Sequence, residues 1–140
     1  MPRTSILLAD DNLAVLDYVR KMLEKDYEIV GALHHGESVL QDWPRLRPNL
    51  ILLDISMGDG NGIEIARRLR SSGCNSQIVF LTIHQDPEFV KAALEAGGAG
   101  YVVKSRMCRD LGLAIDAALS GKRFISPSVA EIQHGVKSEG

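Results

Sequence analysis

The stretch "NLILLD", residues 49–54, decides the fold. Four apolar residues, Leu50 to Leu53, stand in a row, and the carboxylate of Asp54 follows them directly before the glycine-rich sequence "ISMGDGNG". A short apolar run between polar and glycine residues is typical of a strand that is covered on both faces, as in a parallel sheet. We therefore expect a buried parallel strand with Asp54 at its carboxyl end.

Similar apolar, β-branched runs occur at residues 5–9, 27–33, 77–82 and 100–104, so that five strands are expected in all. Segments with helical spacing of apolar residues alternate with them. This alternation predicts an α/β fold, in which right-handed crossovers join parallel strands and helices cover both faces of the sheet.

Five helices are expected between and after these strands. They run from Leu13 to Leu23, around residues 36–46, from after Gly62 to Gly73, from Asp86-Pro87 to Gly97 or Gly98, and from about Cys108 to Ser120. Asp11 or Asn12 is expected to cap the first helix. Pro44 and Pro48 are expected to limit the second helix, because proline removes a backbone donor.

Length and composition indicate a single globular domain. The chain has 140 residues, 45% hydrophobic residues and a net charge of -2, which provides no general attraction to nucleic acid. Cys74 and Cys108 lack metal-ligand spacing, and no signal peptide or membrane-spanning stretch is visible. We therefore expect a cytoplasmic protein that contacts neither membranes nor, through this segment, DNA.

Polar residues follow four of the expected strands. They are Asp10, Asp11, Asp54, Thr82 and Lys104. In an open parallel sheet such residues meet at the carboxyl ends of the strands. Three carboxylates in one crevice repel each other unless a cation binds, and a purely oxygen-based ligand set favours Mg²⁺, with Mn²⁺ as a substitute.

A cation at this site would allow Asp54 to act as a nucleophile that accepts a phosphoryl group. The ammonium of Lys104 and the hydroxyl of Thr82 would then stabilise phosphoryl oxygens. Taken singly, each residue has a structural explanation, as a strand-end cap, a solvated lysine or a β-branched strand residue. The combination of the five favours the functional explanation.

These motifs resemble the receiver domain of two-component response regulators. The resemblance covers about residues 5–121 and rests on "LLADDN", "LILLDISM", "VFLT" and "GAGYVVK". It implies a flavodoxin-like (βα)5 fold with a five-stranded sheet in the order 2-1-3-4-5. It also implies a receiver at residues 1–122, followed by a linker at residues 123–140 with a short helix, beginning at Ser126-Pro127 or at Ser128–Glu131, and a disordered tail.

The resemblance implies a role for each site residue. Asp54 would accept a phosphoryl group from a sensor histidine kinase, in a protein that catalyses only its own phosphorylation and slow dephosphorylation and is no conventional enzyme. Asp11 would bind Mg²⁺ directly, Asp10 partly through water, and Ser56 through its backbone carbonyl. Lys104 would pair with the phosphoryl group.

The resemblance also implies a switch. Thr82 would move toward the phosphoryl group and Tyr101 would turn inward into the space that it leaves. This changes the surface of the fourth helix, fifth strand and fifth helix, a two-state response that can control homodimer formation.

The segments "LTIHQDPEFVKAALEAGGAGYVVK" and "GKRFISPSVAE" are similar to the subfamily in which a LuxR-type helix-turn-helix domain follows the receiver. This favours the regulatory part of a transcriptional regulator, with DNA bound only by a further C-terminal domain. The alternative is a stand-alone receiver that acts through protein–protein interactions.

Three rival functions share the fold class. A haloacid-dehalogenase-like phosphatase needs a second aspartate two residues after Asp54, where Ser56 stands. A flavodoxin-like FMN carrier needs a phosphate loop after the first strand, where "ADDNLAV" would repel phosphate. A metal-free interaction module remains open. His84, beside Thr82, is interpreted as a packed or solvated histidine rather than as a residue that controls water access to Asp54.

Overall fold

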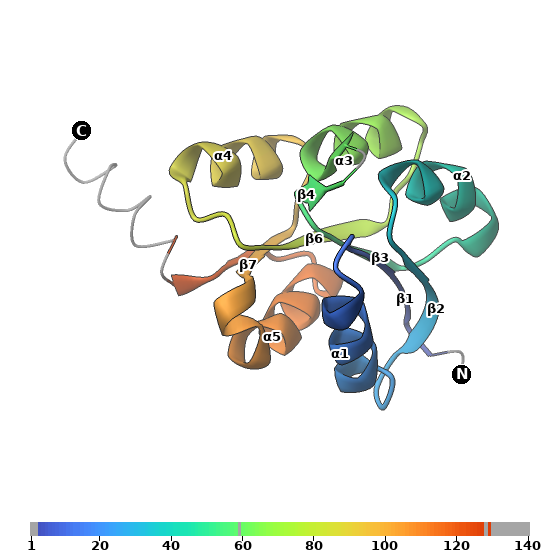
Figure 1. Ribbon diagram of the computed structural model, residues 1–140, viewed down its shortest axis with the longest axis horizontal. Coiled ribbons are helices and arrows are strands. Elements are labelled where there is room, and N and C mark those ends of the chain that lie inside the picture. The colour runs from blue at the N-terminus through green and yellow to red at the C-terminus, as the bar shows by residue number, and fades with distance from the viewer. Residues whose placement is uncertain (1–2, 59, 128, 130–140) are drawn as a thin grey trace.

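The computed structural model describes residues 3–58, 60–127 and 129. A six-stranded parallel sheet in the order β2-β1-β3-β6-β7-β8 forms the centre of the molecule. Helices α1 and α5 cover one face, and α2, α3 and α4 cover the other (Figure 1). The predicted α/β fold with helices on both faces is confirmed.

The elements of the main sheet and the helices follow one another along the chain. They are β1 (Ser5–Ala9), α1 (Leu13–Leu23), β2 (Glu28–Leu33), α2 (Gly36–Leu46), β3 (Leu50–Leu53), α3 (Gly62–Ser71), β6 (Gln77–Thr82), α4 (Pro87–Glu95), β7 (Gly100–Val103), the 3-10 turn η1 (Lys104–Arg106), α5 (Met107–Leu119) and β8 (Phe124–Ile125). Between β3 and α3, the short strands β4 (Ser56–Met57) and β5 (Gly60–Asn61) form an antiparallel pair.

The predicted count of five strands is wrong, although the order of those five strands is as predicted. Phe124 and Ile125 add a sixth strand at the edge of the sheet, where they pair with Gly100 and Tyr101. A two-residue strand is too short to produce a periodic pattern in the sequence, so it could not be predicted. Its pairing depends on where the end of α5 places the chain. The sheet therefore continues into residues that the sequence assigned to a linker.

Strand β3 is buried on both faces, as its unbroken apolar run predicts. Leu50 and Leu52 point into the core beneath α1 and α5, whereas Ile51 and Leu53 point into the core beneath α2, α3 and α4. All four are at most 3% exposed, and burial of each side chain contributes roughly 1.5–3 kcal/mol. The most stable part of the sheet thus carries Asp54 at its end.

The helices match the predicted segments with local differences. Asn12 caps α1 by accepting hydrogen bonds from the N–H groups of Ala14 and Val15. Leu13, the first residue of α1, is 65% exposed, and the buried residues of this helix begin one turn later at Leu16. Asp86 precedes α4 and makes no side-chain capping bond, whereas Pro87 occupies the first turn.

The C-terminal segment also differs from the linker that the sequence predicts. The expected capping box from Ser128 to Glu131 lies outside the described residues. Ser126 and Val129, which are described, are fully buried. None of the described helices is long and apolar enough to cross a membrane.

Candidate functional site

The polar residues at the carboxyl ends of the strands meet because of the strand order. Strands β1 and β3 are neighbours, with Ala9 opposite Leu53, and the N–H of Asp54 donates to the carbonyl of Ala9 at 3.0 Å. The next residue of each strand therefore lies beside the other. This register brings the carboxylates of Asp10 and Asp54 to one place.

Three carboxylates form a cluster here. Oxygen atoms of Asp10, Asp11 and Asp54 all lie within 4.8 Å of one another. Asp10 and Asp54 are each only 3% exposed, whereas Asp11 is exposed to solvent. The cluster is thus built from two buried acids and one acid at its opening.

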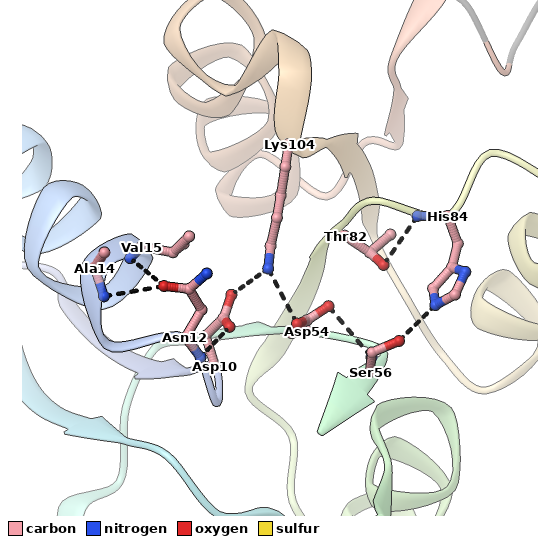
Figure 2. Close-up of polar contacts among 9 residues, drawn as sticks. All are labelled: Asp10, Asn12, Ala14, Val15, Asp54, Ser56, Thr82, His84 and Lys104. Carbon is pink, nitrogen blue, oxygen red and sulfur yellow. Dashed lines mark hydrogen bonds and ion pairs between the residues drawn. The ribbon is translucent and has the colours of Figure 1, made fainter. Parts of the chain in front are cut away.

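Lys104 reaches into this cluster from the turn η1 (Figure 2). Its Nζ lies 2.8 Å from Oδ2 of Asp10 and 3.1 Å from Oδ2 of Asp54, and its side chain is 15% exposed. The contact with Asp54 is a hydrogen bond. The contact with Asp10 is an ion pair, and within the described residues the Lys104 ammonium is the group that faces this buried oxygen.

The charges of the site do not balance. Burial raises the pKa of Asp54, the nearby carboxylate of Asp10 raises it further, and the opposing effects of Lys104 and of the Ser56 N–H are smaller. Burial lowers the pKa of Lys104, but the two carboxylates together raise this pKa above its ordinary value. One ammonium thus serves two buried carboxylates, and a further cation would be favourable.

The residues present fit a hard divalent cation. The cluster offers carboxylate oxygens only, and Oδ2 of Asp10 and Oδ2 of Asp54 share the single ammonium of Lys104. Oxygen ligands with an opening for water at Asp11 are the donors that Mg²⁺ prefers. Asp10, Asp11 and Asp54 are the side chains that could hold it.

Neighbouring residues fix the orientation of the two buried acids. The N–H of Asn12 donates to Oδ1 of Asp10 at 2.8 Å, while the Asn12 side chain caps α1. The N–H of Ser56 donates to Oδ1 of Asp54 at 3.3 Å. A Cβ atom on Gly62 would lie 2.0 Å from the carbonyl oxygen of Asp54, so only glycine fits there. Sequence reasoning had not recognised this requirement.

His84 connects several groups beside the cluster (Figure 2). The ring Nε2 lies 2.5 Å from Oγ of Ser56. The backbone N–H of His84 donates to Oγ1 of the buried Thr82 at 3.3 Å. Its ring stacks on Phe89 with centroids 4.3 Å apart. Sequence reasoning missed the bond to Ser56, because it joins two segments that are 28 residues apart along the chain.

Tyr101 is buried in this structure. Its hydroxyl donates to the carbonyl of His84 at 2.8 Å, and burial raises the pKa of the phenol. The inward position that the resemblance assigns to one state of the switch is therefore the position seen here.

Comparison with known proteins identifies the family. The response regulator receiver domain family matches residues 6–116. The chain belongs to this family. The receiver domain contains the whole acidic cluster and the turn that carries Lys104.

The relatives of this receiver are a transcriptional regulatory protein and a response regulator. The chain is 31% identical to DesR, a transcriptional regulatory protein of Bacillus subtilis (strain 168), over 91% of its own length and 64% of the length of DesR. It is also 31% identical to the response regulator UvrY of Escherichia coli (strain K12), over 91% of the chain and 59% of UvrY. The chain thus spans about 60% of the length of these relatives.

Solved structures agree with this assignment. A LuxR-family two-component response regulator from Aurantimonas sp. SI85-9A1 has a TM-score of 0.87 and 30% identity, covering 92% of this chain and 94% of that one. The isolated receiver domain of RcsB from Salmonella enterica serovar Typhimurium, in the presence of phosphomimetic BeF3-, has a TM-score of 0.85 and 28% identity, covering 92% and 97%. The flavodoxin-like receiver fold is confirmed.

Proposed function

We propose that this receiver accepts a phosphoryl group on Asp54 from a sensor histidine kinase, in a reaction that depends on Mg²⁺. The observation that carries this proposal is the buried Asp54 carboxylate at the end of β3, beside Asp10 and in contact with the ammonium of Lys104. An oxygen of Asp54 attacks phosphorus, an O–P bond forms, and the bond from phosphorus to the donor breaks. The donor atom keeps the electron pair.

The other residues of the cluster serve this transfer. Asp11, Asp10 and the backbone carbonyl of Ser56 would hold the ion, and Asp54 would share it. Bound Mg²⁺ supplies positive charge that reduces repulsion between the carboxylates and the incoming phosphoryl group. Lys104 stabilises a phosphoryl oxygen, and Thr82 donates its hydroxyl to another. The protein catalyses its own phosphorylation and slow dephosphorylation.

Phosphorylation of the purified protein tests the role of Asp54. With Mg²⁺ and acetyl phosphate, intact-mass spectrometry should show a gain of one phosphoryl group, and Asp54→Asn should abolish it. Asp17→Asn, an exposed residue of α1 paired with Lys21, is the matched control and should be phosphorylated normally. A full mass gain in Asp54→Asn would refute the assignment.

A titration tests the metal site. Mg²⁺ should bind the native protein, and Mn²⁺ should replace it. Asp11→Asn should weaken the binding of both ions by about tenfold or more, because the variant loses one charged ligand. Isothermal titration calorimetry measures these affinities. Equal affinity in Asp11→Asn would remove Asp11 from the ligand set, whereas failure of the native protein to bind either ion would favour a metal-free interaction module.

We infer that the output is transcriptional. The support is the likeness to DesR and UvrY, and the proposal is that this receiver regulates a DNA-binding domain that belongs to the same protein. In this proposal the receiver is cytoplasmic, does not touch DNA itself and forms a homodimer after phosphorylation. The second candidate is a stand-alone receiver that binds a partner protein.

Hydrogen exchange tests the switch. Phosphorylation should change exchange rates in α4, β7 and α5, because Thr82 of β6 and Tyr101 of β7 transmit the signal to these elements. Sedimentation of the same samples reports dimer formation. Unchanged exchange across these three elements would exclude this surface as the output.

A further inference from the structure

A buried side-chain pair joins α5 to the segment that follows it. Ser126 is fully buried, and its hydroxyl donates to Oδ2 of Asp110 at 2.8 Å. The same hydroxyl oxygen accepts the backbone N–H of Val103 at 3.1 Å. Asp110 is itself only 3% exposed. A buried carboxylate costs folding free energy unless hydrogen bonds satisfy it, so these bonds fix Asp110 and Ser126 in one arrangement.

Arg106 completes the bonding of Asp110. Its Nε donates to Oδ2 of Asp110 at 2.8 Å, and one terminal nitrogen lies 3.5 Å from Oδ1. Val103 is the last residue of β7 and Arg106 is the last residue of η1. The pair Ser126–Asp110 therefore holds both ends of the turn that carries Lys104.

The same pair fixes the edge segment, defined as residues 124–127 and 129. Strand β8 pairs with β7, and the N–H of Ser126 donates to the carbonyl of Tyr101 at 2.8 Å. The side chain of Val129 is fully buried in the core beneath α2, α3 and α4. The edge segment thus contacts the strand of Tyr101 and the core beneath α2, α3 and α4, and it reaches the turn of Lys104 through Val103 and Asp110.

We propose that Ser126 and Asp110 are positioning residues for Lys104, and that they couple the edge segment to the phosphoryl site. A lysine ammonium is a point charge on a flexible stem, so its location depends on the backbone that carries it. An error of about 1 Å in such a group can reduce a rate 100-fold. The inference rests on the proposed phosphoryl transfer and goes beyond it.

Coupling between two sites is reciprocal. If the Ser126–Asp110 pair favours the Lys104 position that binds a phosphoryl group, then a bound phosphoryl mimic must strengthen the pair by the same factor. Two independent measurements therefore report one quantity. The first is the affinity for beryllofluoride in the presence of Mg²⁺, and the second is exchange of the Val103 amide hydrogen, which bonds directly to Ser126.

The experiment compares the native protein with Ser126→Ala and Asp110→Asn. Ser126→Ala removes the hydroxyl, whereas Asp110→Asn keeps the shape and one acceptor oxygen. Ser76→Ala is the matched control, because the Ser76 hydroxyl donates to the carbonyl of Pro48 at 2.6 Å next to the amino-terminal end of β6, far along the strand from the acidic cluster. All four proteins are titrated with beryllofluoride, and Val103 exchange is followed by NMR with and without it.

Ser126→Ala should weaken beryllofluoride binding about fivefold or more, and Asp110→Asn should weaken it less. Beryllofluoride should slow Val103 exchange in the native protein and not in Ser126→Ala. Binding by both variants within twofold of native would overturn the inference, as would an equal loss in Ser76→Ala. If Ser126→Ala does not fold, Asp110→Asn alone tests the inference, and beryllofluoride binding by this variant within twofold of native would overturn it. Failure of the native protein to bind beryllofluoride would overturn the proposed function as well.

Discussion

Asp54 illustrates how a single side chain is prepared for chemistry. It lies at the end of a strand that is buried on both faces, and its carboxylate is next to that of Asp10. Burial and this second negative charge raise its pKa, although Lys104 and the N–H of Ser56 act in the opposite direction. The site without a cation is therefore held at a cost in folding free energy, and binding of positive charge would reduce that cost.

Replacement of Asp54 by asparagine should stabilise the metal-free protein. At pH 7 the ionised carboxylate is unfavourable in the folded state, so Asp54→Asn should gain roughly 1–2 kcal/mol in the free energy of unfolding. The folded pKa lies above the unfolded value of 3.8, so the gain should shrink as the pH falls toward that value. Urea denaturation in EDTA at pH 7 and pH 4.5 measures it, and a loss of stability at pH 7 would contradict this electrostatic account.

Lys104 should contribute in the opposite sense. Lys104→Met leaves two buried carboxylates without their counter-charge and should cost about 3–5 kcal/mol in the metal-free protein. The double variant with Asp54→Asn should recover part of this loss, and a double-mutant cycle measures the coupling. Because the folded pKa of Lys104 is raised above 10.5, its stabilisation is complete below that pH and is lost above it. Additive single-variant effects would contradict the pairing.

At the scale of secondary structure elements, the connection from β3 to α3 positions Asp54. The β4–β5 pair and the start of α3 are close enough that the backbone at Gly62 touches the backbone of Asp54. The N–H of Gly62 donates to the carbonyl of Ile55 at 2.7 Å. A glycine is needed here for space, and not for an unusual backbone angle.

Gly62→Ala should therefore displace the backbone of Asp54. The added methyl group has no room, so we expect a loss of about 1–3 kcal/mol or more in unfolding free energy, together with slower phosphorylation by acetyl phosphate. Gly60→Ala is the matched control, because a Cβ atom there meets no atom within 4 Å. Thermal unfolding and mass spectrometry provide the two measurements. If both variants behaved alike, close packing at Gly62 would not matter.

At the scale of the whole molecule, the chain adds a further strand to the sheet after α5. The edge segment adds strand β8 and places Ser126 and Val129 in the interior. The boundary predicted at residue 122 would separate these residues from the receiver. The buried contacts favour a domain that includes them.

A shortened chain tests this boundary. Residues 1–122 alone should be less stable than the full chain by about 2–4 kcal/mol, because burial of Val129 and the bonds of Ser126 are lost. Urea denaturation of the two proteins measures the difference. Equal stability would place the end of the domain at residue 122, as the sequence predicted.

Local patterns were sufficient for much of this protein. The apolar run before Asp54 predicted a buried parallel strand, and the alternation of strands and helices predicted the layers of the fold. The general rule for parallel sheets then placed Asp10, Asp54, Thr82 and Lys104 at one end. The order of the strands, by contrast, came from the family resemblance, because no local pattern encodes which strands are neighbours.

Contacts between distant segments required the tertiary structure. Ser56 meets His84, and Ser126 meets both Asp110 and Val103, only after the sheet has assembled. Each of these side chains alone has an ordinary sequence context. The sequence by itself determined the buried strand β3 and the acids at the strand ends, because an apolar run and the residue that follows it are properties of neighbouring residues. Only the tertiary structure decided the sixth strand and the bonds around Lys104, because these depend on the relative positions of elements that are far apart in the chain.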